Sequence, residues 1–220
     1  MIELYAITDH PAPALPDAER LRVVARGSLA GVYAEATAEQ TITPDGLWRH
    51  EQIVEELMQE RTVLPVRYGT RFADERAAGQ VLEERREQFT AALDRVRGAV
   101  ELAVRVIGPA DEPTPVAVPS SQPAATAPAQ AGTEYLRARL REHASESEAV
   151  HLVHEPLSAL AREHVLRPVV LPHERMRAAY LVEATEVQAF STAVRRLQDA
   201  QPSLLITCTG PWPAYSFTQS

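Results

Sequence analysis

The alternation of apolar and polar residues divides the first 108 residues into short strands and two long helices. Period-two alternation predicts strands at residues 2–8, 21–26, 29–36 and 99–107, with a hairpin turn at Gly27 between the second and the third. Apolar residues at helical spacing predict helices from about residue 43 to 61 and from 74 to 97. Two helices on one face of a mainly antiparallel sheet would give this region a ferredoxin-like α+β arrangement.

The first predicted helix has a recognisable start. Thr43 is a suitable N-cap, and Pro44 fits the first helical position. In the second helix, Arg85 interrupts the apolar stripe and is expected at its margin. The apolar stripe of the first helix is expected to bury Leu47, Val54, Leu57 and Met58.

Residues 109–132 differ sharply in composition from the residues on either side. Six prolines lie among Ala, Ser, Thr and Gln, with too little apolar bulk to form a core. We therefore expect a semi-rigid linker between an N-terminal domain at residues 1–108 and a smaller C-terminal α+β domain at residues 133–220.

The C-terminal domain is expected to contain a long helix at residues 133–165, which ends before Pro168. Thr185 and Gln188 form the pattern of a capping box and predict the start of a second helix. Strands are expected at residues 169–171, 176–183 and 204–209. An aromatic tail with Gly210, Trp212, Tyr215 and Phe217 then closes the chain and is expected to pack on its own C-terminal domain.

One stretch, residues 62–72, combines an apolar run with a proline, a glycine and two arginines. Pro65 limits this run to an edge strand or an extended connector, because proline cannot donate to a central ladder. Gly69 suits a tight turn with a positive φ angle. Arg67 and Arg71 flank this turn. They could pair with carboxylates, or they could bind an anion, as in a small-molecule sensor with an α+β fold.

Composition and motifs restrict the function further. The net charge of −8 argues against nucleic acid as the main partner. We expect no signal peptide and no membrane span, and a single cysteine, Cys208, is consistent with a reducing cytoplasm. No phosphate loop, dinucleotide motif or nucleophile elbow is present in the sequence, so we expect no catalytic residues and no cofactor. Five histidines between His143 and His173 are expected on the surface rather than at a metal.

Three features, in the same order along the chain, resemble the gas vesicle protein F/L family (GvpF/GvpL). The first is the opening strand Leu4-Tyr5-Ala6-Ile7, and the second is Val63-Leu64-Pro65-Val66-Arg67-Tyr68-Gly69-Thr70, preceded by His50-Glu51. The third is Gly210-Pro211-Trp212-Pro213-Ala214-Tyr215-Ser216-Phe217. Tyr68 stands where the family usually has phenylalanine, and Ala214 stands where a second proline is common.

The resemblance implies a cytoplasmic accessory protein of gas vesicle formation, and so of buoyancy. Such a protein would bind the major gas vesicle shell protein, and other accessory proteins are further candidate partners. The family implies no catalysis, and from charge and sequence we expect no nucleic-acid or membrane partner. The residues expected to bind the partner are Arg67, Tyr68, Arg71 and Tyr33. Those expected to maintain the structure of the motifs are Pro65, Gly69, Gly210, Trp212, Tyr215 and Phe217.

Overall fold

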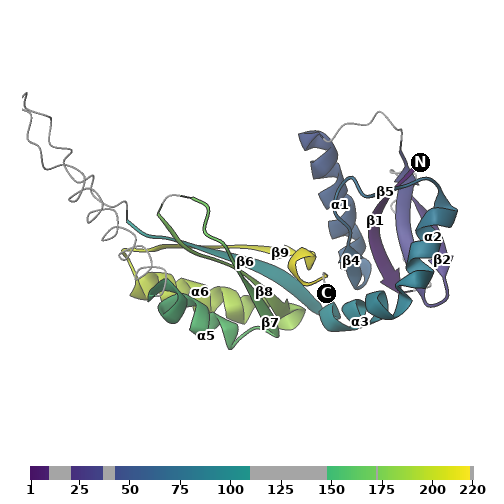
Figure 1. Ribbon diagram of the computed structural model, residues 1–220. Helices are drawn as coiled ribbons and strands as arrows, with labels where there is room; N and C mark the ends of the chain where they lie inside the picture. Colours follow the sequence, from purple (N-terminus) through teal and green to yellow (C-terminus); the bar gives the residue numbers. More distant parts are fainter. Residues whose placement is uncertain (10–20, 37–42, 110–147, 172, 219–220) are drawn as a thin grey trace, which may run out of the picture. The chain divides into compact units, whose positions relative to one another are not determined.

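The computed structural model describes residues 1–9, 21–36, 43–109, 148–171 and 173–218 (Figure 1). The fold is α+β, as the sequence predicts, and contains two sheets. No helix in these ranges is long and apolar enough to cross a membrane. The chain divides into two compact units: Met1–Leu102 with Leu181–Ala184 and Gly210–Ser220, and Ala103–Tyr180 with Thr185–Thr209.

The first unit is built on a five-stranded antiparallel sheet. Gly27 has a φ angle of 59° in the hairpin turn, as expected, and Pro65 lies in a strand at the edge. A short strand, β5 (Arg71–Phe72), pairs with the start of β1. The other strands lie in the order β2 (Arg22–Arg26), β3 (Leu29–Glu35), β1 (Ile2–Asp9) and β4 (Val63–Pro65).

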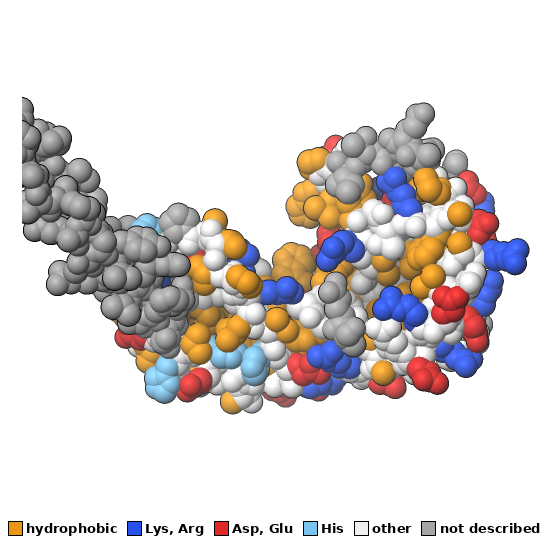
Figure 2. All heavy atoms as spheres, in the orientation of Figure 1, with side chains coloured by type: hydrophobic (Ala, Val, Ile, Leu, Met, Phe, Trp, Pro, Cys, Tyr) orange, Lys and Arg blue, Asp and Glu red, His pale blue; other side chains and the backbone are white. Residues whose placement is uncertain are grey.

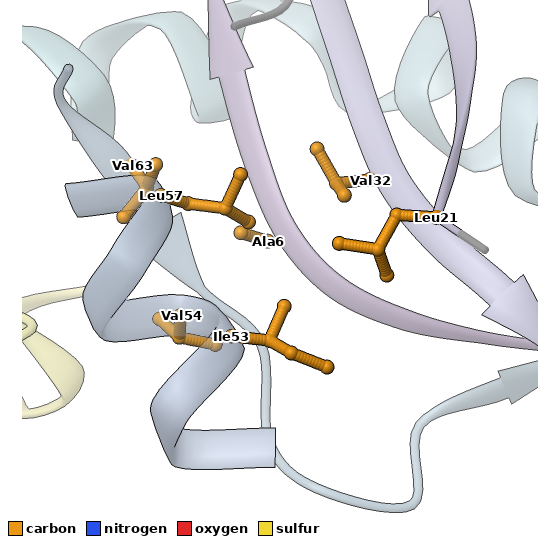
Figure 3. Packing of buried hydrophobic residues seen from close by; sticks show 7 residues of the cluster. All are labelled: Ala6, Leu21, Val32, Ile53, Val54, Leu57 and Val63. Carbon is orange, nitrogen blue, oxygen red and sulfur yellow. The ribbon is translucent and has the colours of Figure 1, made fainter. Parts of the chain in front are cut away.

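Helices cover both faces of this sheet. Helix α1 (Pro44–Glu60) packs on the face that carries Ala6 and Val32 (Figure 3). On the other face, a Cβ atom added to Gly31 would lie 3.4 Å from Leu82 of α2 (Glu75–Glu84). Because neighbouring residues of a strand point to opposite faces, α1 and α2 lie on opposite sides of the sheet. In this detail the structure differs from the expectation of two helices on one face, and the ferredoxin-like arrangement stays a prediction.

Helix α1 begins as the sequence predicts. Thr43 is its N-cap, and the Thr43 hydroxyl accepts a hydrogen bond from the backbone N–H of Gly46 at 3.1 Å. Val54 and Leu57 are buried, together with Ile53. Leu47 is 45% exposed, so the prediction that it belongs to the buried stripe is wrong.

The second predicted helix is interrupted at Arg85. Helix α2 ends before this residue, whose φ and ψ angles are −109° and 21°, and α3 (Arg86–Val96) begins directly after it. The Arg85 guanidinium lies over the ring of Phe89, and its Nε atom donates to Gln88 at 2.8 Å. The interruption therefore coincides with the residue that breaks the apolar stripe.

The second sheet has the strand order β7 (Glu163–Arg167), β8 (Glu174–Glu183), β6 (Ala99–Ile107) and β9 (Leu205–Trp212). Strand β6 comes before the predicted linker, while its two neighbours follow it. The domains expected at 1–108 and 133–220 therefore both contribute strands to this sheet. Of the linker expected at residues 109–132, all but the first residue lies outside the described residues.

Two predictions for the C-terminal half need correction. The helix expected at 133–165 is described only from residue 148, as a π-helical turn (Val150–His154) and α5 (Glu155–Ser158). Its expected last turn is instead β7, because residues 163–167 pair with β8. Residues 169–171 do not form a strand. The Glu174 carboxylate accepts hydrogen bonds from the N–H groups of Val170 and Leu171, at 3.0 and 3.3 Å, and so holds this segment as a turn.

Helix α6 (Val187–Ala200) follows a 3₁₀ turn at Ala184–Glu186. The predicted capping box of Thr185 and Gln188 does not form, because the N-cap is one residue later, at Glu186, which makes no side-chain capping hydrogen bond. Phe190 packs its ring 5.2 Å from that of Tyr180 on β8, and both residues are fully buried.

Candidate functional site

The turn after β4 is anchored by a buried carboxylate. Glu3 lies on the central strand β1 and is only 3% exposed. Its Oε1 atom accepts a hydrogen bond from the backbone N–H of Gly69 at 3.3 Å, and its Oε2 atom lies 3.5 Å from Nε of Arg71. Gly69 has a φ angle of 81°, so the predicted positive φ at this position is confirmed. The carboxylate of Glu3 thus ties the turn to the middle of the sheet.

His50 fastens the same turn to α1. This side chain is 1% exposed, and its Nε2 atom lies 2.7 Å from the backbone oxygen of Val66. The ring stacks on Tyr5 at 5.0 Å and lies 5.5 Å from the ring of Tyr68. Burial lowers the pKa of His50. Because a carbonyl oxygen can only accept, the Nε2–H group donates the hydrogen bond to Val66.

Tyr68 completes the connection between the turn and the start of α1. Its hydroxyl lies against Gly46, where any added Cβ atom would overlap with it. Gly46 is therefore the residue that lets the tyrosine ring approach the first turn of the helix. The residues of the second sequence motif, together with His50 and Arg71, form one structural cluster around Glu3, which we call the motif cluster.

The four residues expected to bind a partner have different environments. Arg67 is exposed, whereas Tyr68 and Arg71 are half-buried within the motif cluster. Tyr33 lies apart from them on β3, 1% exposed, and its hydroxyl bonds to the carboxylate of Glu75. Burial and this carboxylate raise the pKa of Tyr33 to about 12. The structure thus brings together Arg67, Tyr68 and Arg71, but not Tyr33, and their role in binding stays a prediction.

Two residues that the sequence did not single out for binding lie beside the motif cluster. Trp48 is 70% exposed, and its neighbour Leu47 is 45% exposed, in the first turns of α1. A helical projection could have identified Trp48, because it is out of phase with Ile53, Val54 and Leu57. Its exposure distinguishes it from an aromatic core residue.

The aromatic tail contributes to the first unit. Glu101 of β6 is 8% exposed, and its carboxylate accepts hydrogen bonds from the N–H and the hydroxyl of Ser216, at 2.8 and 2.7 Å. Phe217 is 1% exposed, and its backbone oxygen lies 3.5 Å from Nη1 of Arg95 on α3. Tyr215 lies against Glu51 of α1, and burial together with this carboxylate raises the pKa of its hydroxyl. The sequence-based prediction that the tail packs on the C-terminal domain is therefore wrong, because the tail belongs to the first unit.

Gly210 and Trp212 stand at the entrance to this tail. Gly210 has a φ angle of 118° and precedes a cis peptide bond to Pro211. A Cβ atom on Gly210 would come within 2.7 Å of the backbone oxygen of Glu101, so glycine is required there by both conformation and space. Trp212 is 41% exposed and is not the main buried residue of the tail.

A second aromatic and histidine cluster lies within the second unit. His154 is only 6% exposed, so the expectation that it lies on the surface is wrong. Its Nδ1 atom lies 2.8 Å from the Tyr180 hydroxyl, and its ring lies 4.5 Å from that of His164. Burial lowers the pKa of His154, and the nearby His164 lowers it further. Among the described residues, no group of three or more His, Cys, Asp or Glu side chains could hold a metal ion, while His143 lies outside them.

Comparison with known proteins decides the family. The model of the family described as "Gas vesicle synthesis protein GvpL/GvpF" matches residues 3–219. The chain belongs to this GvpL/GvpF family. It is 30% identical to gas vesicle protein L of Streptomyces sp. over 187 residues, 79% of this chain and 68% of that protein. It is 24% identical to gas vesicle protein F1 of Halobacterium salinarum over 204 residues, 91% of this chain and 82% of that protein.

Two crystal structures of GvpF have the same fold as this member of the GvpL/GvpF family. The protein from Anabaena sp. superposes with a TM-score of 0.81 and 20% identity, covering 100% of this chain and 96% of that one. The protein from Microcystis aeruginosa gives a TM-score of 0.77 at 20% identity, covering 100% and 99%. Membership of the family gives the chain a role in gas vesicle formation.

Proposed function

We propose that this protein is an accessory protein of gas vesicle formation that binds the major shell protein and assists its assembly into the gas-filled shell. One observation carries the proposal: the family match spans residues 3–219 and so includes both units and the motif cluster. A shell subunit that exposes apolar surface before assembly needs a partner to cover it. In the proposal the protein acts by binding, in the cytoplasm and on growing vesicles, and catalyses no reaction.

The first unit is proposed to carry the main contact. Arg67 is the exposed member of the predicted binding residues and projects from a turn that Glu3 and His50 hold in place. Tyr68 and Arg71 would act by fixing this turn, and Tyr33 by fixing β3. The alternative of an anion-binding sensor is less favoured, because the Arg71 guanidinium lies beside the Glu3 carboxylate, which an anion would have to displace.

The test is capture of the full-length protein by immobilised major shell protein. Binding is expected from the wild type and weaker binding from Arg67→Ala, with Arg196→Ala on α6 as a control for loss of one exposed arginine. The full chain is needed, because residues 1–110 alone would lack the tail that pairs with Glu101. Failure of the wild type to bind would contradict the proposal.

A further inference from the structure

An exposed tryptophan marks the start of α1. Trp48 is 70% exposed, Leu47 is 45% exposed, and hydrophobic side chains gather over the end of the first unit where α1 begins (Figure 2). An indole at this exposure leaves most of its apolar area in water, and burial in an interface would remove that area from water. Tryptophan is also among the residue types that contribute most to binding energy in interfaces.

The turn that presents Trp48 is firmly held from the inside. His50, two residues further on, is 1% exposed and bonds to the backbone of Val66. Thr43 caps the helix, and the hydroxyl of Tyr68 lies against Gly46 in the same turn. A side chain carried by a fixed backbone loses less conformational freedom on binding than one on a loose segment. The exposure of Trp48 therefore belongs to an ordered, preorganised surface.

Three carboxylates lie on the same side of α1 as Trp48. Asp45 lies three residues before it, and Glu55 and Glu56 lie seven and eight residues after it, which places them on the same side of the helix. The whole helix carries five carboxylates and one arginine. A lysine- or arginine-bearing partner complements this charge. A second copy of α1 or a nucleic acid would be repelled by it.

We infer that this surface docks a basic, apolar segment of the major shell protein. The surface, here called the Trp48 face, consists of Asp45, Leu47, Trp48, Glu55 and Glu56. The indole enters an apolar pocket of the partner, and the carboxylates face its lysine or arginine side chains. The inference rests on the proposed function and adds to it the surface and the chemistry of the contact.

The apolar half of the inference is tested with full-length variants on immobilised major shell protein, with dissociation constants measured by biolayer interferometry. Trp48→Ala is expected to weaken binding at least about tenfold, as for a residue that dominates an interface. Leu205→Ala is the matched control, because Leu205 is 55% exposed in the second unit, and it should bind as the wild type does. Both variants should keep the wild-type melting temperature, since neither removes a buried side chain.

The electrostatic half uses charge reversal. Glu56→Lys on α1 and Asp199→Lys at the exposed end of α6 change the net charge equally. Only Glu56→Lys is expected to weaken binding, and wild-type binding should decrease as salt concentration rises. Equal effects of the two variants would show that net charge alone matters and would contradict a local contact at α1.

The remaining outcomes separate the inference from the proposed function. No binding by the wild type would overturn both. Wild-type binding that survives Trp48→Ala and Glu56→Lys unchanged would overturn the inference and leave the proposed function standing. Analytical ultracentrifugation of the same variants tests whether a second copy of this chain occupies the Trp48 face instead. Self-association that Trp48→Ala abolishes, with shell binding intact, would assign the Trp48 face to a second copy of this chain and overturn the inference.

Discussion

Glu3 shows how a single buried carboxylate can organise a loop. One carboxylate oxygen accepts a hydrogen bond from the Gly69 N–H, and the other lies beside the Arg71 guanidinium. Both partners follow Glu3 by more than sixty residues in the chain. Removing either partner would leave part of a buried carboxylate unsatisfied, which costs more than the hydrogen bond itself contributes. The conformation of the turn and the burial of the Glu3 carboxylate therefore depend on each other.

Gly69→Val should lower the free energy of unfolding by about 1–3 kcal/mol, because a β-branched residue is strained at the φ angle of 81° found here. Chemical denaturation with urea measures the change. Gly69→Asn is the matched control, since asparagine tolerates a positive φ better, and it should lose less stability. Equal stability of Gly69→Val and the wild type would show that the turn relaxes without strain.

Acidification should destabilise the protein through His154. Burial lowers the pKa of His154 in the folded state, whereas in the unfolded chain the ring has its ordinary pKa of about 6.5. Between these two values the unfolded state binds more protons, so the stability present at neutral pH is lost as the pH falls below about 6.5. Urea midpoints between pH 7.5 and 5 should decrease, and His154→Gln should reduce this decrease.

Two comparisons control the pH experiment. His151→Gln removes an exposed histidine from the same segment and is the matched variant for the loss of one imidazole. His50, whose pKa is also lowered by burial, should leave a residual slope in His154→Gln. If His154→Gln and the wild type lose stability in parallel, the lowered pKa of His154 has no part in the acid response.

At the scale of elements, the aromatic tail after Gly210 packs into the first unit, most of which consists of residues 1–102. Glu101 and Ser216 are separated by 115 positions, yet they form two hydrogen bonds. Ala214 and Phe217 of the same tail are buried, while Trp212 remains 41% exposed. The tail therefore stabilises the first unit mainly through its last aromatic residue.

Phe217→Ala should lower the free energy of unfolding by about 3–5 kcal/mol, the usual range for removing a buried aromatic side chain. Trp212→Ala should cost less, because much of that side chain is already in water. Thermal and urea unfolding of the full-length variants measure both losses. The reverse order would mean that Trp212 contributes more to the core than its exposure indicates.

Features that one or two neighbouring residues determine were predictable from sequence. The Thr43 cap, the hairpin at Gly27, the positive φ of Gly69 and the edge position of Pro65 follow from local chemistry. Strand β7 was not predictable, because it forms only through pairing with β8. The face that α2 covers and the packing of the tail were also missed, since both depend on contacts between distant segments. The sequence motif located the motif cluster, but not the exposed Trp48 beside it.

At the scale of the whole molecule, the second sheet joins both halves of the chain. Strand β6 lies between β8 and β9, although it precedes the predicted linker and they follow it. Every interior strand needs neighbours on both edges to satisfy its backbone groups. Cutting the chain in the linker would therefore leave a central strand in one piece and its partners in the other.

Limited proteolysis should cut between residues 112 and 130 and give fragments near 1–110 and 131–220. Under native conditions we expect the two fragments to elute together in gel filtration, since β6 remains paired with β8 and β9. They should separate only in denaturant. Spontaneous separation in buffer would show that β6 is not integral to the second sheet, and uniform resistance to protease would show that the predicted linker is packed.

The position of β6 also sets an order of events during synthesis. A ribosome adds about 5–20 residues per second, so β6 emerges seconds before β8 and β9 exist to pair with it. In that interval the backbone edges of β6 lack these partners, and Glu101 lacks its hydrogen bonds to Ser216, 115 residues later in the chain. A chain that ends before Gly210 would lack the tail, so Glu101 and the first unit would stay incompletely packed. We expect cells to degrade such truncated chains rather than accumulate them in a folded form.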